Sequence, residues 1–449
     1  MNKVSSLPLL WNRFQHKTAF VAAVVLLLIW QIRFITFEAQ IIEPDPFPNK
    51  SGNHIQERIA TAQNAYIQLL ERQSKSLGAA RTEYQRRYQR NPPDKFDEWY
   101  NYAVKHNSLI IDDFDSIEES LRPFRAYYRR GCALDLQEQK KGTFLKEVRL
   151  MQVCVRDGKL HLAGDQYIEI VDGLKSMIKT FIDKLPEICF HMNMADEPRS
   201  LLPFDTTEQD AEGEGFCPSI SFIRYEKQNW WSEAVLSCPP DSPARRFPGR
   251  PEPPWDGKLL DDFKSTTELC SHTTPVEHGV LTSPDTLYQC HNVVPILSNA
   301  GLSTSSDVLF PSMYRYYSTR EYNATTDIPW AQKAPKAYWR GSTTGGHNFP
   351  HGYERMQRHR LVAYANSEDS PIKKYTDVGF TKLVQCEEEV CKEMKEHFKI
   401  EENHKAFATV WQSKIAIDID GNGLSGRFYP LLRSNSAVFR QSSKYKHPS

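Results

Sequence analysis

The sequence has no excess of charge of either sign, because 56 Lys and Arg residues stand against 56 Asp and Glu residues among 449. Proteins that bind nucleic acid usually carry a positive surplus, so the composition gives no support to that class. There is no internal repeat of fixed period, and no glycine-rich loop ends in the Gly-Lys-Ser/Thr of a Walker motif. Aromatic residues make up 12% of the chain, which indicates folded structure, and the length allows two domains with their own cores.

An apolar run follows three basic residues near the N-terminus. It extends from Thr18 to Trp30, and its mixed extension to Ile35 brings it near the lower limit of about 17 residues for a spanning helix. Such a short span suits the thin bilayer of the secretory pathway. We therefore expect residues 18–35 to be a signal anchor, with residues 1–17 cytosolic and the body in the lumen of the ER or Golgi. The alternative is a cleaved signal peptide, although no small-x-small cleavage site follows the run.

Cysteines and glycosylation motifs are compatible with a lumenal body. Nine cysteines lie between Cys132 and Cys391, and in an oxidising compartment some of them should pair. Cys386 and Cys391 could be half of a metal site, but no second Cys or His pair has a matching spacing, so a disulfide or two unrelated thiols is favoured. Asn49 and Asn323 begin Asn-x-Ser/Thr acceptors for N-glycosylation.

Periodicity divides the chain after the predicted anchor. Residues 55–90 have helical spacing of apolar side chains and read as a stem helix, which NPPD at 91–94 ends. Residues 96–124 predict two amphipathic helices around an acidic turn, with Asp115 as a helix cap. Strands are expected at 147–155 and 188–194. From residue 294 onward strands and helices alternate, which is typical of βαβ units and a parallel sheet.

A glycine-rich junction follows one of these strands in KAYWRGSTTGG, residues 336–346. The pattern predicts a strand to Trp339, a loop, and a helix at 351–366. Such a loop directs backbone N–H groups at a phosphate, and Arg340 at the strand end adds a charged fork for a diphosphate. A surface turn would explain the stretch alone equally well.

A second stretch, residues 414–440, repeats this arrangement. Its strand alternates apolar residues, turns at Gly421 and Gly423, and leads to a helix with Ser425 as N-cap and Arg427 in the first turn. Two such units bring two arginines to one crevice at the carboxyl ends of parallel strands. Together the arginines can offset the charge of a diphosphate without a metal ion.

Carboxylates occur at the end of a third strand and on the strand of the second glycine-rich stretch. Asp196 follows an apolar strand in ADEPR, where it is placed to act as a general base or to initiate a turn. Asp418 and Asp420 alternate on one strand and could both reach a Mn²⁺ ion. We favour a structural Asp418 and a turn-starting Asp420 over that metal site.

Several separated motifs together resemble one enzyme family. They are WRGSTTGG, DGNGLSGRFYPLLRSNS, YTDVGFT (375–381), SDVLFPSMY (306–314) and the leader at 71–103. They are similar to the capsule-associated glycosyltransferases, whose relatives include a fungal β-1,2-xylosyltransferase of capsule synthesis and the animal protein O-glucosyltransferases. The resemblance covers the chain from about residue 55 to its end.

The resemblance implies an α/β fold of the two-lobed glycosyltransferase B type, with two Rossmann-like domains. The stem and linker would span 36–90, the acceptor-side lobe 91–305 and the donor lobe 306–449. The implied donor-binding residues are Arg340, Gly341, Ser342, Thr343, Gly421, Gly423, Ser425 and Arg427. Asp196 matches the catalytic base of an inverting transfer of xylose or glucose from a UDP-sugar to a glycan or protein hydroxyl, with no cofactor required.

The C-terminus departs from the family pattern. The chain ends soon after the second phosphate motif, without a KDEL-like signal, so we expect an incomplete donor lobe. The alternative function is therefore a catalytically inactive, membrane-tethered relative that binds glycans or acts as a scaffold. UDP-dependent thermal stabilisation would distinguish a folded donor lobe from this alternative.

Overall fold

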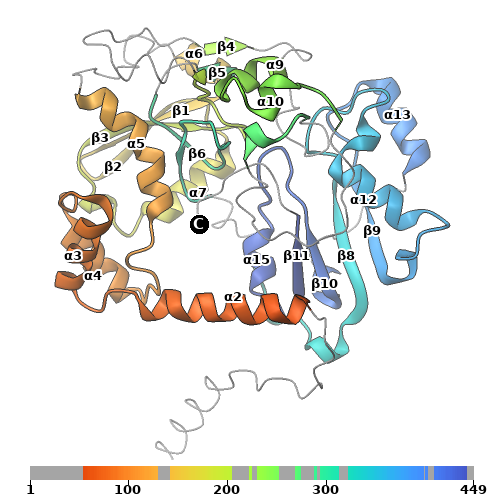
Figure 1. The fold of residues 1–449 in the computed structure, drawn as a ribbon, viewed down its shortest axis with the longest axis horizontal. Helices are drawn as coiled ribbons and strands as arrows, with labels where there is room; N and C mark the ends of the chain where they lie inside the picture. The colour runs from red at the N-terminus through yellow and green to blue at the C-terminus, as the bar shows by residue number, and fades with distance from the viewer. Residues whose placement is uncertain are drawn as a thin grey trace, which may run out of the picture. The chain divides into compact units, whose positions relative to one another are not determined.

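The computed structural model describes residues 54–129, 142–204, 222–224, 230–251, 268–274, 288–290, 294–312, 322–398, 400–402 and 409–441. The chain forms two compact units, of which the first comprises residues 1–86 and 91–112 and the second comprises 87–90 and 113–449. Figure 1 labels their helices and strands. The predicted anchor and its tail, Asn49 and Cys132 lie outside the described residues. Within the described ranges, no helix combines the length and the apolar character needed to cross a bilayer. The predicted boundary at 305/306 stays a prediction.

The first unit is built from helices. They are α2 (His54–Glu71), α3 (Leu77–Tyr88) and α4 (Phe96–Lys105), and α3 and α4 pack through a small core that includes Ala80, Tyr100 and Ala103. The prediction of one continuous stem helix over 55–90 is wrong, because the chain breaks at 72–76. There Gln73 is buried, and its side-chain oxygen accepts the backbone N–H groups of Ile111 and Asp112 at 2.7 and 3.0 Å. This tertiary pairing replaces the continuation of the helix.

The second unit begins with helices and a mixed sheet. Its first elements are α5 (Asp115–Arg129), α6 (Gly142–Glu147), β1 (Leu150–Arg156), β2 (Lys159–Gly164), α7 (Ile168–Ile178) and β3 (Ile188–Asn193). The sheet has the order β2-β1-β3-β6-β7, with β6 (Ile296–Ser298) and β7 (Val308–Leu309) parallel to β3. β1 pairs antiparallel with both β2 and β3. The apolar face of α7 packs on this sheet, where Leu174, Val153 and Met192 are almost fully buried.

Both predicted strands of this region are confirmed to within a few residues. The first begins at Leu150 rather than Glu147, because α6 occupies the preceding residues. The two helices expected within 96–124 are confirmed as α4 and α5. Asp115 is the first residue of α5, and its carboxylate accepts a hydrogen bond from Tyr88 at 2.7 Å.

Shorter elements complete this part of the second unit. They are β4 (Phe222–Arg224) paired with β5 (Tyr288–Cys290), α9 (Trp230–Ala234) and α10 (Pro243–Arg246). The short 3-10 helices are η2 (Ile182–Lys184), η3 (Val235–Ser237), η4 (Leu269–Ser271), η9 (Trp330–Gln332), η10 (Tyr353–Arg355), η11 (Lys373–Tyr375) and η12 (Val410–Gln412). The disulfides of the described residues are Cys154–Cys189, Cys238–Cys270 and Cys386–Cys391. The preference for a disulfide over a metal site at Cys386 and Cys391 is thus confirmed.

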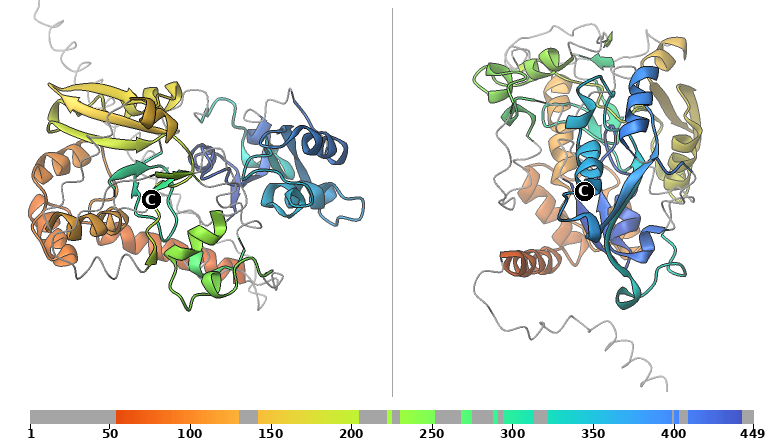
Figure 2. Two further views of the ribbon diagram at one scale, coloured as in Figure 1. Left: turned by 90° about the horizontal axis from the view of Figure 1, so that it is seen from above. Right: turned by 90° about the vertical axis from the view of Figure 1, so that its right-hand side faces the viewer.

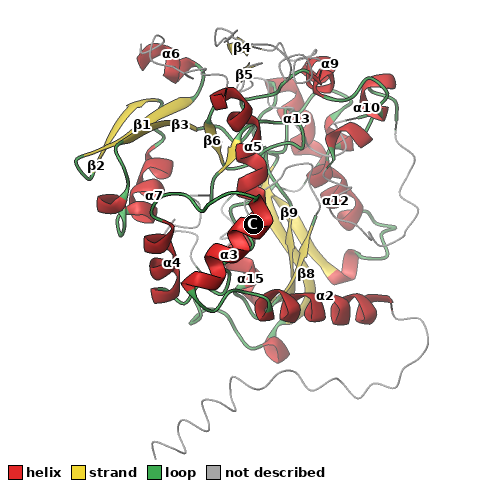
Figure 3. Ribbon diagram, turned by 60° about the vertical axis from the view of Figure 1, so that its left-hand side comes forward, coloured by secondary structure: helices red, strands yellow, loops and turns green. Residues whose placement is uncertain are grey.

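The C-terminal sheet is parallel throughout, as the alternation of elements predicts. Its order is β11-β10-β8-β9, formed by β8 (Ala334–Ser342), β9 (Thr376–Lys382), β10 (Ser413–Asp418) and β11 (Ala437–Arg440) (Figure 1). Figure 3 shows β8 and β9 of this sheet among the strands drawn in yellow. Helices α12 (Gln357–Asn366) and α13 (Glu388–His397) cover one face through a core that includes Trp339, Phe380 and Met394 (Figure 2). The short helix α15 (Phe428–Leu432) belongs to a second core with Tyr338 and Trp411.

Two predicted boundaries in this sheet are wrong. Strand β8 does not end at Trp339 but continues to Ser342, because β9 pairs with it as far as Ser342 opposite Lys382. The helix expected over 351–366 begins only at Gln357. Before it the chain makes the turn η10, and Met356 has an extended backbone, with φ −72° and ψ 146°. The later end of β8 and the later start of α12 change which residues lie at the carboxyl end of the sheet.

Candidate active site

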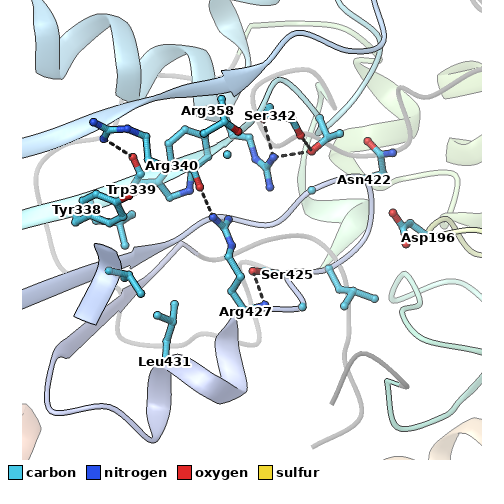
Figure 4. Close-up of a pocket in the computed structure, with 18 residues that line it drawn as sticks. Asp196, Tyr338, Trp339, Arg340, Ser342, Arg358, Asn422, Ser425, Arg427 and Leu431 are labelled. Atoms are coloured by element: carbon cyan, nitrogen blue, oxygen red, sulfur yellow. Dashed lines mark hydrogen bonds between the residues drawn. The ribbon is translucent and has the colours of Figure 1, made fainter. Parts of the chain in front are cut away.

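A cavity of about 500 Å³ lies at the carboxyl ends of β8 and β10 (Figure 4). Most of its lining comes from β8, β10 and the loops that follow them, and Asp196, which comes after β3, joins them. The predicted residues that line it are Asp196, Arg340, Gly341, Ser342, Gly421, Ser425 and Arg427. Thr343, Gly423, Asp418 and Asp420 are not among its lining residues. The structure therefore gathers both glycine-rich loops and the candidate base at one cavity.

The loop after β8 is held by the segment that follows β9. The Thr343 hydroxyl donates to the Val384 carbonyl at 2.9 Å and accepts the Val384 N–H at 2.8 Å. The buried amide of Asn348 donates to the carbonyls of Val384 and Gln385 at 2.8 and 3.1 Å. Gly345 has a φ of +119°, a backbone conformation that a side chain would strain. Thr343 thus fixes the loop, while its neighbour Thr344 lines the cavity.

The loop after β10 differs from the expected helix start. Helix α15 begins at Phe428, so Arg427 stands directly before it rather than in its first turn, and Ser425 lies further upstream. The Ser425 hydroxyl donates to the carboxylate of Asp418 at 2.5 Å. The same hydroxyl oxygen accepts the backbone N–H of Arg427 at 3.4 Å. The prediction of Ser425 as the N-cap is nevertheless wrong, because α15 begins at Phe428 and Arg427 holds the N-cap position. The place of Ser425 in the cavity lining is unchanged.

Arg340 directs its guanidinium to carboxylates. Nη2 donates to Asp377 at 2.6 Å and Nε donates to Glu401 at 3.1 Å, and the side chain is 5% exposed. Burial acts to lower the pKa of Arg340, but the hydrogen bonds and charges of Asp377 and Glu401 outweigh it, so the pKa is raised. The positive charge is thus compensated within the protein. Binding of a phosphate by Arg340 stays a prediction.

Arg358, from the first turn of α12, is a cavity residue that the sequence reasoning did not select. Its guanidinium donates to the carbonyls of Ser342 at 2.9 Å, Asp420 at 3.0 Å and Ile419 at 3.0 Å, and to the Thr344 hydroxyl at 2.5 Å. It therefore joins the two glycine-rich loops. Within the described part of the chain, none of these hydrogen-bond acceptors is a carboxylate.

Burial, followed by the charge of nearby Arg427, lowers the pKa of Arg358 to about 9. At neutral pH the group remains charged, in a place where its charge is costly. An anion in the cavity would relieve this cost. The signal for Arg358 was present in the sequence as a group of basic residues at 355–360, but only the packing of α12 shows which of them lines the cavity.

Arg427 approaches the same place from the other loop. Its Nη1 donates to the backbone carbonyl of Arg340, and its Cζ lies 5.8 Å from the ring of Trp339. The Cζ of Arg358 lies 5.4 Å from the same ring. The indole thus lies near two cations, an arrangement that its negative face favours. Two neighbouring guanidinium groups beside a cavity are suited to a ligand with two negative phosphates.

Asp196 stands at the exit of β3 in a segment that is otherwise buried. Among residues 191–200 it alone is half-buried, and it lines the cavity near Asn422 (Figure 4). The segment is held on both sides: Asn193 accepts the N–H of Ala195 at 2.9 Å, and the buried carboxylate of Asp307 accepts the N–H of Ser200 at 2.8 Å. A carboxylate at this place can accept a proton from a group bound in the cavity.

Asp418 and Asp420 are buried outside the cavity lining. Burial raises the pKa of Asp418, and Arg440 approaches Asp420 at 3.6 Å. Over the described ranges, no group of three or more His, Cys, Asp or Glu side chains could hold a metal ion. The pair fits a structural role better than a Mn²⁺ site that serves the cavity, and transfer without a required metal stays a prediction.

Comparison with known proteins supports the enzyme class. Residues 277–447 match the family model of glycosyl transferase family 90. This match contains the whole C-terminal sheet and both glycine-rich loops, whereas Asp196 lies outside it. No curated protein matches the chain. The resemblance to a glycosyltransferase family is thus confirmed for this part, and it supports glycosyltransferase activity with a sugar donor and a glycan acceptor in general. The relation to particular xylosyl- or glucosyltransferases stays a prediction.

Proposed function

We propose that this protein is an inverting glycosyltransferase that takes its sugar from a UDP-sugar bound in the cavity between the β8 and β10 loops. The observation that carries the proposal is the pair Arg358 and Arg427, whose guanidinium groups line one cavity beside small-residue loops. Arg358 contacts carbonyl and hydroxyl oxygens there and keeps its charge for a ligand. In this proposal Arg358 takes the place at the diphosphate that the sequence assigns to Arg340.

Catalysis would be a single displacement. The Asp196 carboxylate takes the proton of the acceptor hydroxyl while that oxygen attacks the anomeric carbon. The bond from the anomeric carbon to the phosphate oxygen breaks, and the electron pair leaves with UDP. Arg358 and Arg427 stabilise the charge that develops on the leaving diphosphate, an effect worth about 10²–10³-fold in rate for one donor.

The donor sugar is xylose or glucose, and the acceptor is a hydroxyl of a glycan or a protein, as in capsule or cell-wall synthesis. The reaction takes place in the lumen of the ER or Golgi, with the protein held by the helix predicted at 18–35. Disulfides in the described residues support an oxidising compartment. Asn323, the glycosylation acceptor that the structure describes, is exposed.

No metal cofactor is needed, because two arginines offset the charge of the diphosphate. Addition of EDTA therefore leaves transfer unchanged, whereas a loss that Mn²⁺ restores would reassign Asp418 and Asp420.

The test compares transfer by the purified full-length chain with that of Asp196→Asn. Labelled UDP-xylose and UDP-glucose are offered with mannan and with protein acceptors. We expect Asp196→Asn to lower kcat by about 10²–10⁴-fold, the usual contribution of a general base, and to leave UDP affinity nearly intact.

The matched control is Asp157→Asn, which changes an exposed carboxylate in the turn between β1 and β2 and leaves transfer unchanged. Asparagine tolerates the positive φ of 48° at this position. Transfer by Asp196→Asn at the wild-type rate would show that the base lies elsewhere. Absence of transfer from either donor to any acceptor, with no binding of UDP, would refute the proposed function.

A further inference from the structure

The turn at residues 421–423 contacts both the diphosphate side of the cavity and the segment of the proposed base. Its last residue, Gly423, packs directly on the backbone of Asp196. A Cβ atom at Gly423 would lie 2.2 Å from the Asp196 carbonyl oxygen and 2.9 Å from its carbonyl carbon. These are backbone atoms, so a change of side-chain rotamer cannot relieve the overlap. The turn and the Asp196 segment thus approach as closely as they do because residue 423 has no side chain.

The other two residues of the turn face the phosphate side. The Asn422 side-chain oxygen accepts the backbone N–H of Gly345, in the loop after β8, at 3.0 Å. A Cβ at Gly421 would lie 3.4 Å from the Thr344 hydroxyl and 3.5 Å from Nη2 of Arg358. The three consecutive residues of the turn therefore lie against different parts of the site. Gly421 lies beside Arg358, Asn422 binds the loop after β8, and Gly423 packs on the backbone of Asp196.

The Asp196 segment has little freedom to move away from this turn. The buried side chain of Asn193 donates to the Glu197 carbonyl at 2.5 Å, and its oxygen accepts the N–H of Ala195. On the far side, the buried carboxylate of Asp307 accepts the N–H groups of Arg199 and Ser200 at 2.9 and 2.8 Å. A side chain at residue 423 must therefore displace the turn rather than be absorbed by the segment.

We infer that Gly423 is a positioning residue, whose missing side chain sets the separation between the donor diphosphate and the Asp196 carboxylate. The inference rests on the proposed glycosyl transfer. It replaces the sequence-based assignment of Gly423 to donor binding, since this residue does not line the cavity. A misplacement of about 1 Å can lower a rate about 10²-fold when reacting groups must meet in one geometry. The affinity for the diphosphate depends on Arg358 and Arg427 and is separate from this effect.

The experiment compares kcat for sugar transfer with the UDP dissociation constant in three variants of the full-length chain. Gly423→Ala lowers kcat by about 10–100-fold and keeps UDP affinity within about twofold of wild type. Gly421→Ala acts on the other side of the turn and weakens UDP, because its Cβ lies beside Arg358. Gly352→Ala is the matched control: its Cβ would meet other atoms only at 3.6 Å or more, and it behaves as wild type in both measurements.

A Gly423→Ala variant with wild-type kcat, or with equal losses in kcat and UDP affinity, overturns the inference. If wild type transfers no sugar, the proposed function itself fails. If wild type transfers sugar and Gly423→Ala transfers it equally fast, only the inference fails, so the two failures are distinguishable. Thermal denaturation with UDP shows whether Gly423→Ala is folded. If it is not, Asn422→Ala decides, because it releases the turn from Gly345 without adding an atom. It should lower kcat several-fold more than it weakens UDP, and an unchanged kcat refutes the inference.

Discussion

Replacing Arg427 by methionine removes one of the two cations while keeping much of the apolar stem. The guanidinium of this half-buried residue contacts the carbonyl of Arg340 and lies near Trp339. At about 4 Å from a phosphate, a unit charge contributes ~4 kcal/mol at an effective dielectric constant of about 20. Because Arg427 is partly exposed, we take about half of this value. We therefore expect Arg427→Met to weaken UDP binding by ~2 kcal/mol, which corresponds to roughly 30-fold in the dissociation constant.

Titration calorimetry with UDP and with uridine separates the charge effect from general damage. Uridine lacks phosphates, so its affinity should not change in Arg427→Met. Arg427→Lys keeps the charge but loses the planar fork, and its UDP affinity should lie between those of wild type and Arg427→Met. Arg360→Met is the matched control, because it removes an exposed arginine of α12 that does not line the cavity.

Two outcomes would refute the reasoning. A UDP dissociation constant within about threefold of wild type would show that Arg427 does not contact the diphosphate. An equal loss of affinity for uridine and UDP would show that the substitution distorts the whole cavity. Raised ionic strength should weaken UDP binding more in wild type than in Arg427→Met, because screening acts on the charge that the variant lacks.

Two further predictions concern stability. His359 is buried among the rings of Tyr353, Phe380 and Phe398. Neither of its ring nitrogens has a hydrogen-bond partner in the described structure. Burial lowers the pKa of His359 from 6.5 to about 3. At a pH between these two pKa values, His359 is protonated in the unfolded chain but not in the folded one. The free energy of unfolding therefore falls as the pH falls, by up to about 1.4 kcal/mol per pH unit. His359→Leu should raise the free energy of unfolding by about 1–2 kcal/mol and weaken this acid sensitivity in denaturation curves at pH 4.5 and 7.5; unchanged curves would contradict it. Lys333→Met should lower that free energy by about 3–5 kcal/mol, since it leaves the Asp327 carboxylate without its buried cation. The double variant Lys333→Met/Asp327→Asn should regain part of the loss in the same denaturation assay, and no recovery would contradict a charge-based cause.

Much of the C-terminal sheet could be predicted, because its signals are local. Alternating isoleucines at 415, 417 and 419 and the glycine turn that follows predict β10 and its loop, and the structure confirms a parallel sheet there. The break of the stem helix at 72–76 could not be predicted in this way. It depends on hydrogen bonds that the Gln73 side-chain oxygen accepts from the backbone N–H groups of Ile111 and Asp112, which lie 38 and 39 residues away.

The direction of each arginine was likewise beyond the sequence. Arg340 and Arg358 are both close to the same glycine-rich loop, and their residue type does not show which of them faces the cavity. Asp377 lies 37 residues after Arg340 and Glu401 lies 61 residues after it, and together they bind its guanidinium. Arg358 lies in the first turn of α12, which begins at Gln357 rather than at residue 351, and its guanidinium reaches the carbonyls of Ser342 and Asp420. Successive side chains of a helix point about 100° apart, so which of them faces the cavity depends on how the helix packs, and the local pattern does not give that.

The sequence by itself determined the kinds of element, the two glycine-rich loops, the candidate base and the resemblance to a glycosyltransferase family. These follow from local periodicity and from residue types that serve one chemistry. Only the tertiary structure decided that Arg340 is paired with carboxylates, that Arg358 lines the cavity, and that Gly423 packs on the Asp196 backbone. Each of these depends on groups far apart in the chain, and their distances follow from how the strands and helices pack rather than from the order of the residues.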